Sequence, residues 1–212
     1  MFTCLPQVHG ALSEVAKRAF TDRRIHKIST LQSIWKWIRL NGNREITRRS
    51  GGGRVGGIAV EDHGFLEAAM IIPELKGGEN SVVLEEMAKL MASHYQITDA
   101  KRLLEILLAR ERIGSTAIGE GVAIPHGKVP GVNRVYGAFG RSPKGIDCQA
   151  PDRCLTHLFF LLIAPEDSTS DHLKALARVS RLLKDDKLRA RLMEGKTREE
   201  ILNTLKEKDE KL

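Results

Sequence analysis

A histidine stands where a short apparent strand ends, in the stretch Val122-Ala123-Ile124-Pro125-His126-Gly127. Near neutral pH its ring offers an unprotonated nitrogen, which can act as a nucleophile, a base or a ligand. Pro125 fixes its own φ and favours an extended Ile124, and Gly127 lacks the Cβ that would keep a bulky group from the imidazole. The setting suits a phosphoryl acceptor, and it also fits a turn that merely contains a histidine.

Two other residues carry groups that could stabilise a phosphoryl group on His126. Arg110 lies near the end of a predicted helix, and its guanidinium could fork onto phosphoryl oxygens. His172 falls in the first turn of a later helix, where the helix terminus favours an anion and a ring N–H could donate to it. Phosphoryl transfer needs this kind of positioning and cationic stabilisation more than covalent machinery. Spacing alone leaves incidental placement open.

The elements that must position these residues are predicted by hydrophobic spacing. Residues 80–95 and 98–114 read as amphipathic helices, with Asn80 or Ser81 capping the first, Thr98 capping the second and Gly114 ending it. Strand-like segments follow at residues 116–125, 134–140 and 157–164. The last is continuously apolar, as in a central strand covered on both faces.

Further helices follow the strands, and Thr197 with Glu200 forms a capping box that opens the last one. Helices, then strands, then helices indicate a sheet covered on both faces. We therefore predict an α/β fold, a three-layer α/β/α arrangement with a mixed central sheet, plus a basic N-terminal extension.

The composition indicates the number of domains, the cellular compartment and whether a metal site is expected. The 212 residues leave room for one ordinary domain and something smaller, and the three cysteines contain no CxxC pair, which argues against a zinc site. No apolar run is long enough to span a bilayer, and the N-terminus lacks the order of a signal peptide. We expect a cytoplasmic protein with no membrane insertion and no metal.

Several ordered motifs give the sequence a resemblance to a known family. They are Arg110-Glu111, Gly114-Ser115-Thr116, Ile118-Gly119-Glu120-Gly121, Ala123-Ile124-Pro125-His126-Gly127 and the segment 158–183. Together they resemble the type 2 enzyme IIA component of the bacterial phosphoenolpyruvate-dependent phosphotransferase system, in its fructose and nitrogen-regulatory branch. The similarity covers about residues 70–208.

This resemblance implies a role for each matching residue. His126 would carry the phosphoryl group on Nε2, Arg110 would neutralise it, and His172 would donate to it. Ser115 and Thr116 would add hydroxyl donors. The donor would be the phosphohistidine carrier protein HPr or a paralogue, so no cofactor, nucleotide or metal is needed.

The resemblance leaves the biological role open between sugar uptake and regulation. A sugar-transporting enzyme IIA passes its phosphate to a IIB component and then to a membrane IIC component, and neither follows here. Regulation is therefore favoured, with a IIB component or a regulatory protein as the further partner. The rival hypotheses are a DNA-binding regulator and a protein-binding regulator, in which the domain only senses phosphorylation.

The first 69 residues differ in character from the rest. They hold a net charge of +5 out of +7 for the chain, and residues 41–57 read as a Gly- and Arg-rich loop, so we place the domain boundary near residue 70. Residues 29–69 weakly resemble an excisionase-like winged helix, in which basic charge would contact DNA. The alternatives are a disordered basic extension and translation from Met70. The match of Gly51–Gly56 to GxGxxG lacks the flanking strand and helix that a dinucleotide site requires.

Overall fold

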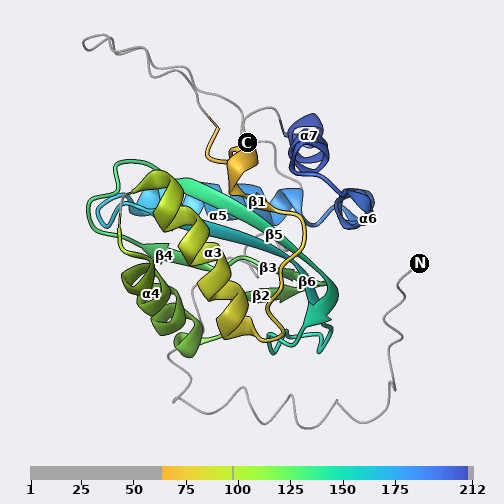
Figure 1. Ribbon diagram of the computed structural model, residues 1–212, viewed down its shortest axis with the longest axis horizontal. Coiled ribbons are helices and arrows are strands. Elements are labelled where there is room, and N and C mark those ends of the chain that lie inside the picture. Colours follow the sequence, from red (N-terminus) through yellow and green to blue (C-terminus); the bar gives the residue numbers. More distant parts are fainter. Residues whose placement is uncertain (1–63, 97, 210–212) are drawn as a thin grey trace, which may run out of the picture. The chain divides into compact units, whose positions relative to one another are not determined.

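The computed structural model describes residues 64–96 and 98–209, and the expectations for residues 1–63 lie outside this part of the chain. Within it, helices flank one mixed six-stranded sheet (Figure 1). The strands are β1 (Ile71–Ile72), β2 (Ala117–Gly119), β3 (Val122–Ala123), β4 (His126–Lys128), β5 (Tyr136–Ile146) and β6 (Thr156–Ala164). Their order is β1-β5-β6-β3-β2, and β4 also pairs with β6. The prediction of an α/β fold with a mixed sheet is confirmed.

Strand β6 lies at the centre of the sheet, as its continuous apolar run predicts. It pairs antiparallel with β5 on one side and parallel with β3 and β4 on the other. Seven consecutive residues, from Leu158 to Ala164, are buried, because helices cover both faces of the strand. The buried central strand therefore fixes the positions of β3 and β4, which pair with it in parallel.

Strands β3 and β4 run along the same edge of β6, one after the other. Ala123 pairs with Phe159 and His126 with Leu162, so the pairing breaks only at Ile124 and Pro125. Proline has no N–H to give to a ladder, and here its carbonyl accepts a 2.9 Å hydrogen bond from the N–H of Leu162. His126 thus begins a short second strand that the central strand holds in register.

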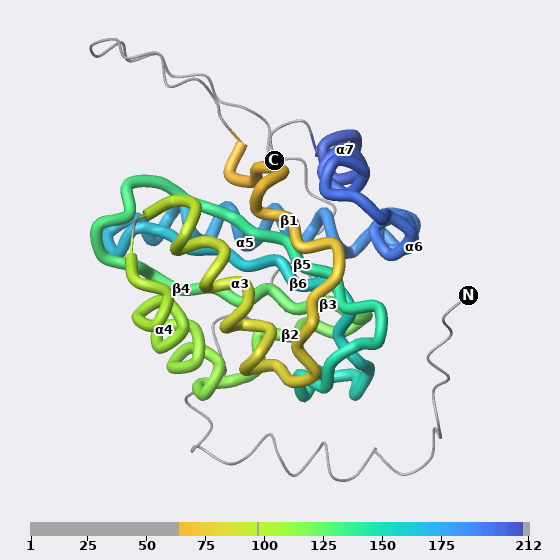
Figure 2. Tube along the Cα trace, viewed as in Figure 1, coloured from red at the N-terminus to blue at the C-terminus, as the bar shows by residue number. Residues whose placement is uncertain are grey.

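The helices form layers on the two faces of the sheet. Figures 1 and 2 show α3 and α4 in front of the strands and α5 behind them, with α6 and α7 beside β1 and β5. Their bounds are α3 (Asn80–Tyr95), α4 (Ala100–Ile113), α5 (Thr169–Leu182), α6 (Asp186–Glu194) and α7 (Arg198–Lys208), and a 3-10 turn, η2 (Ala68–Met70), precedes β1. No helix in the described ranges is long and apolar enough to cross a membrane.

The helix ends correct two predictions and confirm two. Helix α4 is capped by Asp99 and not by Thr98, because the Asp99 carboxylate accepts the N–H of Arg102 three residues along. Asn80 and Ser81 lie inside α3, whose N-cap Glu79 makes no side-chain cap bond. The C-cap at Gly114 and the Thr197 capping box are present as predicted.

The folded unit includes residues ahead of the boundary expected near residue 70. Leu66 is only 3% exposed and belongs to the hydrophobic core. The ring of Phe65 meets that of Phe160 edge-on with centroids 6.0 Å apart, and the Phe65 carbonyl accepts a 2.6 Å bond from the N–H of Gly137. These contacts add Phe65 and Leu66 to the packing around β5 and β6.

Candidate active site

The ring of His126 is held by a hydrogen bond at each nitrogen. Nδ1 lies 2.8 Å from the carbonyl oxygen of Ile124, and Nε2 lies 3.0 Å from Nε of Arg110. A carbonyl can only accept and a guanidinium can only donate. Nδ1 therefore carries the proton, and Nε2 presents its lone pair to Arg110.

Arg110 reaches His126 from the last turn of α4. While its Nε faces the imidazole, its Nη1 donates to the carbonyl of Gly114 over 3.0 Å. That carbonyl follows the helix, so the second bond helps to hold the guanidinium at the mouth of the site. The structure brings these two predicted site residues together although 16 positions separate them in the chain.

His172 meets His126 from the opposite layer. It lies in the first turn of α5, and the two imidazole rings pack edge-on at 73° with centroids 5.3 Å apart. Both side chains are buried, with His172 8% exposed and His126 7%. Nε2 of His172 has no hydrogen-bond partner among the described residues, so this buried nitrogen beside His126 could still form a hydrogen bond.

Burial favours the neutral form of both histidines. Loss of hydration is the main reason that the pKa of His126 falls to about 4, and the charge of Arg110 lowers it further. The hydrogen bond to Ile124 acts in the opposite direction and raises it. The pKa of His172 is also lowered, first by burial and then by the charges of Lys128 and Arg110. Nε2 of His126 therefore stays unprotonated across the physiological pH range, with its lone pair accepting the bond from Arg110.

The hydroxyls of Ser115 and Thr116 have partners other than His126. Ser115 Oγ donates to the carbonyl of Cys148 over 2.5 Å and accepts from the N–H of Ala117. Thr116 Oγ1 donates to Glu111 over 2.7 Å, and the Thr116 N–H bonds the same carboxylate. Both residues thus brace the segment that joins α4 to β2.

Gly127 makes room for helix α4, and not for a group beside the imidazole as its position in the sequence suggests. A Cβ at this residue would lie 2.7 Å from Cγ2 of Ile106, so a side chain there would collide with α4. The glycine admits the helix to the face of β4, where the sequence suggested room for a group beside the imidazole. Close packing of α4 is in turn what brings Arg110 within reach of His126.

Comparison with known domain families finds one that matches the described part of this chain. The family described as "Phosphoenolpyruvate-dependent sugar phosphotransferase system, EIIA 2" matches residues 64–208, which is more than half of the chain.

The chain belongs to this EIIA family. Its members are phosphotransferase components, and the resemblance that the motifs around Arg110 and His126 indicate is confirmed. The match begins at residue 64, where the described structure also begins.

Relatives of this EIIA domain include regulatory and sugar-specific proteins. A nitrogen regulatory protein of Bradyrhizobium diazoefficiens is 40% identical over 135 residues, which is 64% of this chain and 88% of the relative. The fructose-specific EIIABC component of Bacillus subtilis is 35% identical over 135 residues, 64% of this chain and 21% of that protein. The crystal structure of nitrogen regulatory protein IIA-Ntr from Neisseria meningitidis superposes with a TM-score of 0.63 at 32% identity, over 66% of this chain and 96% of that one.

The sequence assigns no role to Lys128, and it includes Glu111 in a motif without indicating its partners. Lys128, two positions after His126, donates from Nζ to the Glu166 carbonyl and to Thr169 Oγ1, each over 2.9 Å. Glu111 collects the Thr116 bonds and one from the Asn80 amide. The alternation of a strand would have placed Lys128 on the same side as His126, but nothing in the sequence names its partners.

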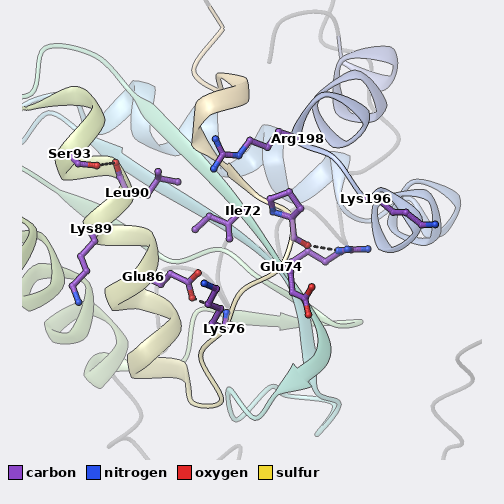
Figure 3. A pocket seen from close by; sticks show the side chains of 11 residues that line it. Ile72, Glu74, Lys76, Glu86, Lys89, Leu90, Ser93, Lys196 and Arg198 are labelled. Atoms are coloured by element: carbon purple, nitrogen blue, oxygen red, sulfur yellow. Dashed lines mark hydrogen bonds between the residues drawn. The ribbon is translucent and has the colours of Figure 1, made fainter.

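A separate groove lies between α3, β1 and the start of α7, and it contains none of the predicted site residues (Figure 3). Its volume is about 840 Å³. Ile72 and Leu90 contribute apolar surface, and Figure 3 shows Arg198 extending from α7 in the direction of α3. Five basic residues and two acidic ones line it: Lys76, Lys89, Arg141, Lys196 and Arg198, with Glu74 and Glu86.

Proposed function

We propose that this EIIA domain carries a phosphoryl group on Nε2 of His126, received from a phosphorylated HPr-type carrier, and that it serves regulation rather than sugar uptake. The observation that carries the proposal is the pair of bonds on one imidazole. Nδ1–H is tied to the Ile124 carbonyl, so only Nε2 has a lone pair to offer, and Arg110 already lies against it. The nucleophile, His126, is therefore buried in direct contact with Arg110, the cation that would stabilise its product.

The transfer itself follows from this arrangement. The Nε2 lone pair attacks the phosphorus of the carrier's phosphohistidine, the new N–P bond forms, and the carrier's N–P bond breaks with its electron pair returning to the carrier's ring. The reaction exchanges one phosphohistidine for another and needs no oxidant or metal. Because His126 is neutral before the attack, no proton has to leave Nε2.

The groups around His126 then stabilise the transferred phosphoryl group. Arg110 would exchange its bond to Nε2 for bonds to phosphoryl oxygens, where a charged donor is worth most because the site is buried. His172 would donate from its unpartnered Nε2 once that nitrogen carries the proton. Ser115 and Thr116 would support the site by bracing the segment next to Arg110.

The regulatory role is supported by the relatives more than by the site. The Bradyrhizobium relative is a nitrogen regulatory protein and is 40% identical, whereas the Bacillus sugar component is 35% identical. We infer a cytoplasmic protein whose phosphorylation state controls a protein target, with a IIB component as the alternative acceptor.

Labelling with the carrier system tests the proposed function. The full chain is incubated with phosphoenolpyruvate, enzyme I and HPr, and its mass is measured before and after mild acid. We expect a gain of one acid-labile phosphate, its loss in His126→Ala and its retention in His94→Gln, a histidine on α3 outside the site. Equal labelling of His126→Ala would refute the assignment.

A further inference from the structure

Lys128 shares a strand and a face with His126. Alternate residues of a strand point to the same side, so His126 and Lys128 lie on one face of β4 and Gly127 on the other. The position of Gly127 fixes which side is which, because a Cβ there would run into Ile106 of α4. Lys128 therefore projects away from α4, toward the layer from which His172 comes.

The Lys128 ammonium joins β4 to the start of α5. It donates to the carbonyl of Glu166, in the loop that follows β6, and to the hydroxyl of Thr169, the first residue of α5. His172 is three residues after Thr169, so its side chain rises from the adjacent turn on the same side of the helix. A cation two residues from His126 thus holds the turn that presents His172.

The same ammonium acts on the protonation of His172. After burial, the charge of Lys128 is the next cause that lowers the pKa of His172, ahead of the charge of Arg110. The charged and titratable groups around His172 are Arg110 from α4, His126 and Lys128 from β4, and the exposed Asp171 beside it on α5. Lys128 therefore disfavours a positive charge on His172.

We propose that Lys128 is a positioning residue of the phosphoryl site, which anchors the first turn of α5 so that His172 meets His126 edge-on. The proposal rests on the proposed function, since it gives Lys128 a part in the transfer to His126. It assigns the residue no contact with the reacting atoms. Its effect passes through the Glu166 carbonyl and Thr169, and from there to His172.

Three variants of the full chain separate this role from a general effect on folding. Lys128→Met keeps the aliphatic stem and removes the donors and the charge, whereas Lys128→Arg keeps both. Lys174→Met removes a lysine from the exposed side of the same helix, where it pairs with Asp171. For each variant we would measure the rate of phosphoryl transfer from HPr, the His172 ring titration by NMR and the melting temperature.

We expect Lys128→Met to transfer about tenfold more slowly, since small misplacements of a positioned group reduce rates strongly, and to titrate His172 at higher pH. Lys128→Arg should restore most of the rate, and Lys174→Met should match the wild type. If Lys128→Met keeps the wild-type rate and His172 titration, or if Lys128→Arg is as slow as Lys128→Met, the positioning role is wrong. Should Lys128→Met fail to fold, Thr169→Val tests the same link, with slower transfer expected and an unchanged rate contradicting it.

Failure of this inference is distinct from failure of the proposed function. If the wild-type chain accepts phosphate on His126 while the lysine variants behave alike, only the role of Lys128 falls. If the wild-type chain accepts no phosphate on His126, the proposed function falls, and the His172 titration still reports whether Lys128 acts on that ring.

Discussion

Arg110 Nε lies 3.0 Å from Nε2 of His126, so the guanidinium occupies the very lone pair that an attack on phosphorus would use. The unphosphorylated site is thus closed by the group that would later stabilise its product. The guanidinium makes its second bond from Nη1 to the Gly114 carbonyl, which does not involve the His126 ring. Docking of a phosphorylated carrier would supply the oxygens that draw Arg110 off the ring.

Replacing Arg110 should slow transfer strongly. We predict that Arg110→Gln lowers the rate of phosphoryl transfer to His126 on the order of a hundredfold, the usual cost of losing one preorganised charge-stabilising donor. The pKa of His126 should rise at the same time, because the charge of Arg110 lowers it in the wild type. Rapid-quench transfer assays and NMR titration measure the two effects.

Arg112→Gln is the matched control, since it removes the same charge from the exposed side of the same helix turn. It should leave both quantities unchanged. Comparable slowing in the two variants would show that the net charge of the α4 terminus, and not the contact with His126, is responsible.

His172 should show opposite effects on stability and on transfer. Its Nε2 is buried and has no hydrogen-bond partner among the residues that the structure describes, and an unsatisfied polar group costs stability. We predict that His172→Leu raises the free energy of unfolding by roughly 1 kcal/mol and slows transfer, while His126 still accepts some phosphate. Urea unfolding measures the predicted gain in stability, and the labelling assay measures the slower transfer. A destabilised variant that transfers normally would contradict both predictions.

Acid should weaken the fold over a defined pH window. The pKa of His126 is lowered from 6.5 to about 4 by burial, so between these values the unfolded chain binds a proton that the folded chain does not. The free energy of unfolding should therefore fall as the pH drops from about 6.5 to about 4. The lowered pKa of His172 acts in the same direction.

Urea unfolding at a series of pH values measures this dependence. The fall should be smaller in His126→Gln, which removes the titrating ring. A wild-type stability that stays constant over the window would show that His126 titrates at its ordinary pKa.

The start of the folded unit can be tested by truncation. A chain that begins at Met70 loses Phe65 and Leu66, whose burial contributes stability on the order of a few kcal/mol. We expect it to melt several degrees below a chain that begins at Gly64. Equal melting temperatures would return the boundary to residue 70, where the sequence placed it.

Much of the site follows from local patterns that a sequence displays. Arg110 near a helix end and His172 in a first helix turn are each found in the predicted element, whereas His126, predicted where a strand ends, begins the separate strand β4. Their meeting depends on the parallel pairing of β4 with β6 and on helices in two layers. The family motif implied that meeting, whereas spacing alone left it open.

Other features depend on partners that are remote in the chain. Gly127 was interpreted as space beside the imidazole, but it is the contact with Ile106 that requires a glycine there. Glu111 has Asn80 and Thr116 as partners, and Lys128 reaches residues nearly 40 positions away. No local pattern encodes such contacts, because they form only once the layers have packed.

The identity of the phosphorylated nitrogen tests the account most directly. The full chain is labelled with ¹⁵N in its histidine rings, phosphorylated with phosphoenolpyruvate, enzyme I and HPr, and examined by two-dimensional NMR correlation of ring protons with ring nitrogens. We predict one phosphohistidine, at Nε2 of His126, with Nδ1 still protonated and hydrogen-bonded to the Ile124 carbonyl. A phosphoryl group on Nδ1 of His126, or on His172, would contradict it.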